Sequence, residues 1–107
     1  MEDIFSHIMN DITNKQRAYL SGLAVNEKAI LELGKSTVTP EFTASLDEAL
    51  EKRELVKISV LKNCGLEINE AASTLAERTK SRVVRVIGRK IIFYRPAKKP
   101  SIVLPKG

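Results

Sequence analysis

Residues 82–94 carry the sequence RVVRVIGRKIIFY. Two runs rich in β-branched and aromatic residues, 82–87 and 90–94, are separated only by Gly88 and Arg89. A two-residue loop with glycine in first place predicts a tight β-hairpin. The C-terminal part of the domain is therefore expected to be a pair of antiparallel strands.

Two more strands and three helices are expected before this hairpin. Residues 55–61 alternate apolar and polar side chains, which predicts a strand with one buried face. The short apolar run 29–33 has the length of a strand as well. Thr13 and Gln16 have the spacing of a capping box, which predicts the start of the first helix.

The other two helices have start signals of their own. Thr39 followed by Pro40 indicates an N-cap and a first helical residue, and this helix is expected to run to about Arg53. Asn69 is expected to cap the last helix. The order α-β-α-β-α-β-β predicts a two-layer α/β domain with a four-stranded mixed sheet. The second and third helices should cover one face of that sheet and leave the other face open.

The length of 107 residues allows one domain and not two separate cores. We expect this domain over residues 13–104, after a leader at 1–12 and before a tail end at 105–107. The single Cys64 cannot form an internal disulfide, and with the single His7 it cannot build a zinc site within one chain. A lone cysteine is typical of a reducing, cytoplasmic setting. No apolar run approaches the ~20 residues of a membrane span. No cofactor is expected.

The positive charge of the chain is concentrated in its C-terminal quarter. The net charge is +5, from 18 Lys and Arg against 13 Asp and Glu. Residues 81–107 contain eight basic residues and no acidic ones, whereas residues 1–12 and 41–54 are each net acidic. A concentrated basic segment favours a polyanionic partner.

Two places in the chain could meet such a polyanion. Lys57 and Arg85 are expected on the open sheet face, beside the basic residues of the hairpin. The loop Gly34 to Thr37 offers backbone N–H groups, a lysine and hydroxyls at the start of a helix, and these groups suit a phosphate. The plainer interpretations are solvated outward positions and an ordinary βα turn, and the residues alone leave both open.

No group of residues has the pattern of a catalytic site, so an enzyme is not expected. Asp47 and Glu51 are interpreted as part of a solvated helix face. Tyr19 and Phe93 are interpreted as core residues rather than as platforms for stacking.

Several ordered blocks of the sequence resemble one protein family. They are KQR at 15–17, ILELGK at 30–35, ELVK at 54–57 and VIGRKIIFYRP at 86–96. Together they resemble the CRM domain, named for chloroplast RNA splicing and ribosome maturation, and above all its stand-alone, YhbY-like bacterial members. The resemblance spans about residues 13–104. It implies an RNA-binding module with a KH-like loop, similar in fold to the C-terminal domain of bacterial translation initiation factor three.

The resemblance also implies a function, with one departure from the family pattern. Stand-alone members are associated with precursors of the large ribosomal subunit, so a large-subunit assembly factor that binds structured ribosomal RNA is expected. The family loop usually reads G-x-x-G, but Thr37 stands where the second glycine would fall, and a β-branched residue rarely adopts positive φ. The alternative is a protein-interaction module that binds an acidic partner through the basic sheet. The residues expected to bind RNA are Gly34, Lys35, Ser36, Thr37, Arg17, Lys57, Arg85, Arg89, Lys90 and Arg95.

Overall fold

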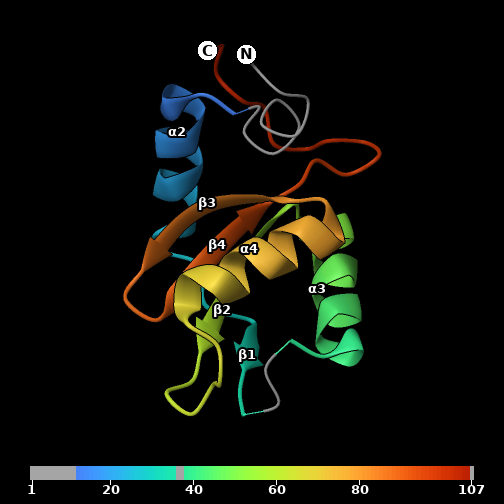
Figure 1. Ribbon diagram of the computed structural model, residues 1–107. Coiled ribbons are helices and arrows are strands. Elements are labelled where there is room, and N and C mark those ends of the chain that lie inside the picture. The colour runs from blue at the N-terminus through green and yellow to red at the C-terminus, as the bar shows by residue number, and fades with distance from the viewer. Residues whose placement is uncertain (1–11, 36–37, 107) are drawn as a thin grey trace, which may run out of the picture.

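The computed structural model describes residues 12–35 and 38–106 (Figure 1). Its elements are α2 (Asn14–Ala24), β1 (Leu31–Leu33), α3 (Pro40–Arg53), β2 (Leu55–Val60), α4 (Ile68–Thr79), β3 (Arg82–Ile87) and β4 (Lys90–Tyr94). The strands form one sheet in the order β1-β2-β4-β3. β1 and β2 are parallel, and β4 is antiparallel to both of its neighbours. The predicted order of elements and the four-stranded mixed sheet are confirmed.

The β3–β4 hairpin has the predicted two-residue loop. Ile87 and Lys90 are the last paired residues, so Gly88 and Arg89 alone make the turn. Gly88 has a φ of 59°, a backbone region that costs glycine less than a residue with a Cβ. The glycine therefore stabilises the turn at its first position.

Side chains close to the helix starts decide where the helices begin. The capping box of α2 is present, with Thr13 and Gln16 exchanging two hydrogen bonds of 3.0 Å. The hydroxyl of Thr39 caps α3, as predicted. The prediction for α4 is wrong, because the N-cap is Glu67 and not Asn69. One carboxylate oxygen of Glu67 accepts from two successive backbone N–H groups, and an ionised acceptor at a helix start is favoured by the helix dipole.

Helices α3 and α4 cover one face of the sheet, as predicted. Leu46 and Leu50 of α3 and Leu75 of α4 are fully buried there. They pack against the inward side chains of the strands, among them Ile58 and Phe93. This layer contains the larger of the two apolar clusters and carries most of the hydrophobic stabilisation.

The opposite face of the sheet is not open as expected, because α2 covers part of it (Figure 1). Leu20 and Ala24 of α2 pack with Ile92 and other residues of β3 and β4 in a second apolar cluster. The reason is visible in β4, where four consecutive apolar residues from Ile91 are all buried. A strand without alternation needs cover on both faces. Tyr19 was expected in the core but is 41% exposed, because it lies one residue, about 100° around the helix, from Leu20.

The buried carboxylate of Glu54 attaches the C-terminal segment to the domain. Glu54 is 1% exposed and has a φ of 68° at the end of α3. Its Oε1 accepts from the backbone N–H of Ile102 at 2.8 Å and from the N–H and hydroxyl of Ser101 at 3.0 Å. Its Oε2 accepts from the N–H of Ala97 at 2.8 Å. One side chain thus holds three backbone N–H groups of the returning chain.

The returning segment then runs along α2. Ile102 and Leu104 pack against the second apolar cluster, and the side-chain amide of Gln16 donates to the carbonyl of Pro105 at 2.8 Å. Ile12 was assigned to the leader, but it is buried in the same cluster. The second layer therefore includes residues from both ends of the described chain.

Candidate nucleic-acid interface

The distance of Arg85 from the hairpin turn decides on which side of the sheet it lies. The pairing of β3 with β4 is regular from the turn back to Arg85, whose Cα partner is Ile92, so both lie on the α2 side of the sheet. Val83 is the partner of Phe93, so Val84 is an extra residue without a partner, directly before Arg85. This bulge places the consecutive residues Val84 and Arg85 on the same side of the sheet.

Two rows of side chains across β2, β4 and β3 point to the α2 side of the sheet. The first row is centred on Ile92 and the second on Lys90, each with partners on both neighbouring strands. α2 buries Ile92 completely, whereas Lys90 is exposed and Ile87 is 45% exposed. The expected basic sheet surface therefore exists, but it is limited to the row at the border of α2, where Lys57 and Arg85 flank the buried Ile92, and to the exposed row of Lys90 beyond it. We call it the hairpin face; it comprises Lys57, Ser59, Arg85, Ile87 and Lys90.

The cations of the hairpin face keep most of their donors free for a ligand. Lys57 Nζ donates once, to the carbonyl of Glu27 at 3.0 Å, and Arg85 makes one long bond of 3.3 Å to the hydroxyl of Ser21. The side chain of Lys90 has no hydrogen bond or ion pair with the described residues. Because a guanidinium has five N–H donors and an ammonium three, several remain for a polyanion. Glu32, on the adjacent β1, is an acid that borders this surface.

Arg17 supports the bulge instead of extending the hairpin face. Its side chain is half-buried, and one nitrogen, Nη1, donates to the carbonyls of Val83 and Val84. These are the carbonyls at the bulge directly before Arg85. Arg17 was expected to contact RNA itself, and in the structure it holds the backbone next to Arg85.

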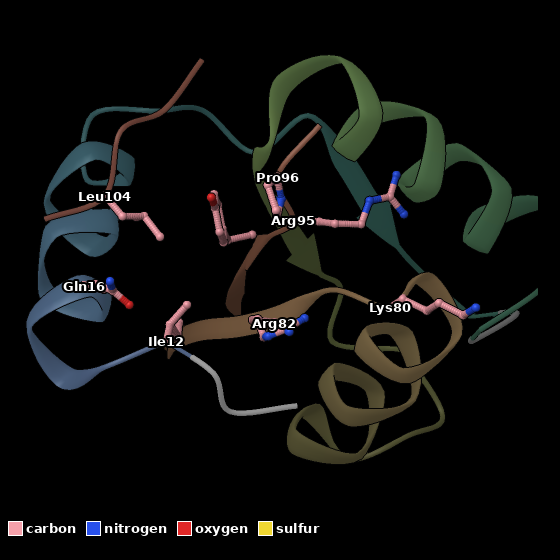
Figure 2. A pocket seen from close by; sticks show the side chains of 8 residues that line it. Ile12, Gln16, Lys80, Arg82, Arg95, Pro96 and Leu104 are labelled. Atoms are coloured by element: carbon pink, nitrogen blue, oxygen red, sulfur yellow. The ribbon is translucent and has the colours of Figure 1, made fainter. Parts of the chain in front are cut away.

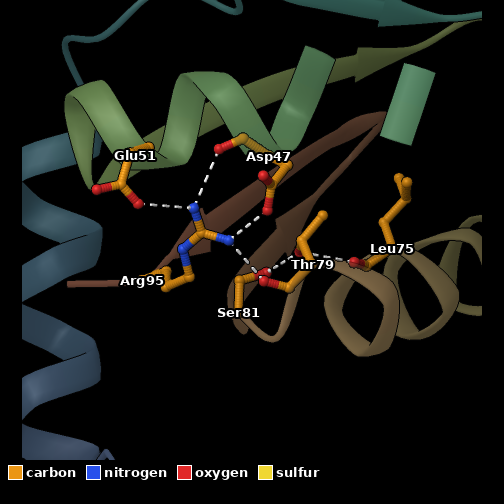
Figure 3. A network of polar contacts seen from close by, with 6 residues as sticks. All are labelled: Asp47, Glu51, Leu75, Thr79, Ser81 and Arg95. Carbon is orange, nitrogen blue, oxygen red and sulfur yellow. Dashed lines mark hydrogen bonds and ion pairs between the residues drawn. The ribbon is translucent and has the colours of Figure 1, made fainter. Parts of the chain in front are cut away.

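Arg95 lies away from the hairpin face, in a network between α3 and the end of α4 (Figure 3). Its Nη1 donates to a carboxylate oxygen of Asp47 at 2.6 Å and to the carbonyl of Thr79 at 2.7 Å. Its Nη2 reaches the carbonyl of Asp47 at 3.0 Å and Glu51 at 3.4 Å. Asp47 and Glu51 are thus more than a solvated helix face. With a side chain only 16% exposed, Arg95 is bound within the protein.

Lys35 and Arg89 come together at the end of the sheet where β1 and β2 finish. The N–H of Leu61 donates to the carbonyl of Leu33, which joins the chain after β2 to β1. Arg89 donates to the carbonyls of Val60 and Leu61, both at 2.8 Å. Lys35, two residues beyond Leu33, is exposed at the same sheet end.

Lys62 adds a positive charge at this sheet end. It is exposed directly after Leu61 and was not among the residues predicted to bind RNA. The signal was available, because Lys62 follows β2 as Lys35 follows β1, and the carboxyl ends of parallel strands meet at one edge of a sheet. Gly34 lies beside Leu61: a Cβ added to Gly34 would lie 3.4 Å from Cδ1 of Leu61. Ser36 and Thr37 lie outside the described residues.

A cleft of about 340 Å³ opens at the other end of the sheet, between α2 and the start of β3 (Figure 2). Ile12, Gln16 and Leu104 face one another across it, while Lys80 and Arg95 point away from them, towards α3 and α4. Three basic residues, Lys80, Arg82 and Arg95, line the cleft without an acidic residue, but the guanidinium of Arg95 is bound to Asp47 and Glu51. Among the residues that the structure describes, no cluster of His, Cys, Asp or Glu could hold a metal ion. In the same part of the chain, no helix has the length and apolar character needed to cross a membrane.

The fold and the hairpin face define a small α/β domain with a cationic sheet surface. The chain belongs to the CRS1 / YhbY (CRM) domain family, whose model matches residues 12–95. It is 37% identical over 87 residues to the "Probable RNA-binding protein YqeI" of Bacillus subtilis, covering 81% of this chain and 91% of that protein. It is 29% identical over 98 residues to an "RNA-binding protein" of Haemophilus influenzae, covering 92% and 99%.

A solved structure supports the same relationship. The solution structure of a hypothetical protein of Staphylococcus aureus, described as a candidate RNA-binding protein, superposes with a TM-score of 0.76 at 41% identity. The match covers 88% of this chain and 99% of the other. The names of these relatives describe binding proteins and not enzymes.

Proposed function

We propose that this protein is a non-enzymatic, cytoplasmic RNA-binding protein whose hairpin face contacts the sugar–phosphate backbone of structured RNA. The observation that carries the proposal is the alignment of Lys57, Arg85 and Lys90 on three neighbouring strands, on the part of the sheet at the border of α2 and beyond it. RNA is the polyanion we infer because the named relatives are RNA-binding proteins. A ribosomal RNA of the large subunit or its precursor is the target we propose.

The spacing of the cations suits contacts to a phosphate backbone. Lys57 and Arg85 are separated by one intervening strand, which places their backbones about 10 Å apart, with Lys90 between them one row further on. Such a set can meet several phosphates of one helix without reading bases, which is how double-stranded RNA is mostly recognised. Lys35 and Lys62 extend the positive surface at the sheet end, and Arg89 holds the hairpin against β2 there.

The loop after β1 belongs to the same proposed interface. Gly34 and Lys35 follow β1 at the sheet end, and α3 begins a few residues later at the cap Thr39. Backbone N–H groups at a helix start and the lysine would together hold one phosphate. Arg95 is left out of the interface, because its guanidinium is bound to Asp47, Glu51 and Thr79.

The proposal is tested by RNA binding across a salt series. We expect Arg85→Ala and Lys90→Ala each to weaken binding and to reduce the log–log salt slope by roughly 0.7 to 0.9, because each removes one phosphate contact. Lys35→Ala tests the loop in the same way. Lys52→Ala is the matched control, since it removes one exposed positive charge on α3, on the other side of the sheet. Lys52→Ala should keep the affinity and slope of the natural protein. If Arg85→Ala and Lys90→Ala keep them as well, the hairpin face is not the interface.

The nature of the partner is tested with the same protein. Fragments of large-subunit ribosomal RNA should bind more tightly than small-subunit fragments of equal length and charge, and polyglutamate should compete weakly. An acidic protein partner is the alternative. Strong competition by polyglutamate, with no preference among RNA fragments, would favour that alternative over RNA.

A further inference from the structure

The side of α2 that points away from the sheet carries an exposed aromatic ring, Tyr19. We call this side, with Lys15, Ala18, Tyr19, Gly22 and Leu23, the outer face of α2. Tyr19 is 41% exposed, and it makes no hydrogen bond or ring contact with the described residues. Leu23, one turn further along, is 40% exposed. The helix is held to the sheet by Leu20 and Ala24, so Tyr19 is not needed for that packing.

Gly22 lies in the interior of the same helix, where the fold does not require a glycine. A Cβ placed on Gly22 would meet no atom within 4 Å, and Gly22 is not among the residues with positive φ. Glycine in a helix interior is destabilising relative to alanine. A glycine that neither the packing nor the backbone demands is explained if a ligand comes close to the helix at this point.

A positive charge lies on the same side of the helix. Lys15 is one turn before Tyr19, so the two side chains are neighbours on the helix surface. The side chain of Lys15 is exposed and makes no hydrogen bond or ion pair with the described residues. Ala18, one turn before Gly22, is small and exposed. The ring of Tyr19, the ammonium of Lys15 and two small residues, Ala18 and Gly22, thus lie next to one another on the helix surface.

We propose that this outer face of α2 binds an unpaired nucleotide of the RNA. The base stacks on the ring of Tyr19, the ribose approaches the helix at Gly22, and Lys15 pairs with a phosphate. Stacking on an aromatic side chain beside a cation is the usual way in which proteins hold single-stranded nucleotides. The inference rests on the proposed function, and it adds a contact with single-stranded RNA to the backbone contacts of the hairpin face.

The two surfaces meet along α2. The hydroxyl of Ser21, one turn before Val25, accepts a hydrogen bond from Arg85 of the hairpin face. Arg17, on the same flank, donates to the backbone carbonyls directly before Arg85. An RNA bound on the hairpin face therefore reaches the outer face of α2 by crossing the width of one helix. A helix with an adjoining unpaired strand is the RNA element that fits both surfaces.

Tyrosine fluorescence reports directly on this contact. The chain has two tyrosines and no tryptophan, and Tyr94 is only 4% exposed. An oligouridylate should quench the emission of Tyr19 as it binds. Tyr19→Phe should keep the affinity, because phenylalanine also stacks. Tyr19→Ala should weaken binding of oligouridylate roughly 5- to 140-fold, the range that corresponds to the loss of one stacked base.

Gly22→Ala separates a binding defect from a folding defect. The added methyl has room in the free protein and improves helix propensity, so the melting temperature should rise while the affinity for oligouridylate falls. Ser45→Ala, at an exposed position of α3, is the control that raises helix propensity away from the site. It should leave the affinity unchanged.

The outcomes distinguish this inference from the proposed function. If Tyr19→Ala and Gly22→Ala bind RNA as the natural protein does, while Arg85→Ala weakens binding, the outer face of α2 is not a nucleotide site and the hairpin face stands. A loss of affinity in Tyr19→Phe equal to that in Tyr19→Ala would also overturn the stacking contact. If polyglutamate but not oligouridylate quenches Tyr19, the surface binds protein. If neither single-stranded nor structured RNA binds the natural protein, the proposed function itself fails.

Discussion

Replacing Glu54 should release the C-terminal segment and lower stability by an amount that depends on pH. Its carboxylate accepts from three backbone N–H groups and one hydroxyl of the segment Ala97 to Ile102. Burial opposes ionisation of the carboxyl, but the hydrogen bonds from Ala97, Ile102 and Ser101 outweigh it and hold the pKa of Glu54 below its ordinary value of 4.5. The carboxylate is therefore ionised at neutral pH.

The magnitude follows from the groups that Glu54→Gln disturbs. The amide oxygen can replace Oε1 and keep the bonds from Ser101 and Ile102, but the amide NH₂ then faces the N–H of Ala97, and two donors cannot bond. A hydrogen bond to a charged group contributes about 1.5 to 3 kcal/mol, and the bonds that remain are weakened because the acceptor is neutral. The loss of stability has an upper limit, because the segment can detach and its N–H groups can then bond to water. We expect a loss of about 2 to 4 kcal/mol at neutral pH.

The pH dependence has a definite sign. Folding lowers the pKa of Glu54, so the carboxylate contributes fully to stability above pH 4.5, where the carboxyl of the unfolded chain is ionised. This contribution disappears as the pH falls through the lower pKa of the folded protein. Urea unfolding of the natural protein and Glu54→Gln at about pH 7 and about pH 3 measures this directly, and the gap between them should shrink at the lower pH. Glu48→Gln, at a carboxylate 72% exposed, is the matched control and should change little. A gap of the same size at both pH values would refute the role assigned to the ionised carboxylate.

The two arginines bound within the protein give further predictions. Arg95→Ala should lower stability by about 1 to 3 kcal/mol in thermal unfolding, since it leaves Asp47 and the carbonyl of Thr79 without their donor. The salt slope of RNA binding should stay the same. A slope reduced by a full contact would place Arg95 on the RNA. Arg17→Met should weaken RNA binding by disturbing the bulge, and the double variant with Arg85→Ala should bind no worse than Arg85→Ala alone. Effects of Arg17 and Arg85 that add in full would show that Arg17 touches RNA independently.

Sequence reasoning predicted part of the candidate site and missed the rest. It placed Lys57 and Arg85 on one sheet surface, and the structure brings them to the hairpin face together with Lys90. The side of Arg85 follows from regular pairing back from the predicted turn, whereas the bulge at Val84, which the alternation of β3 does not indicate, changes the side of the residues before it. Tyr19 was missed because a helix with several apolar residues does not say by itself which of them meet the sheet.

The signals that could be read from the chain alone were local ones. Three features depend only on residues within a few positions of one another: the capping box of α2, the Thr39–Pro40 start of α3 and the turn at Gly88. Such features can be recognised from a short piece of sequence. The concentration of positive charge after residue 80 is likewise a property of the sequence. These features determined the order of the elements, the mixed sheet and the preference for a polyanion.

The tertiary structure alone decided which charged side chains serve the fold and which are free for a partner. Arg95 reaches Asp47 across 48 positions of the chain, Glu54 holds Ile102 across the same separation, and Arg17 reaches the bulge across 66. Such pairs form only when packing brings distant segments together and excludes water from around them, and no local pattern records that event. The cations of the hairpin face lie where α2 ends and the sheet continues, and that boundary is decided by the packing of Leu20 and Ala24 on the sheet.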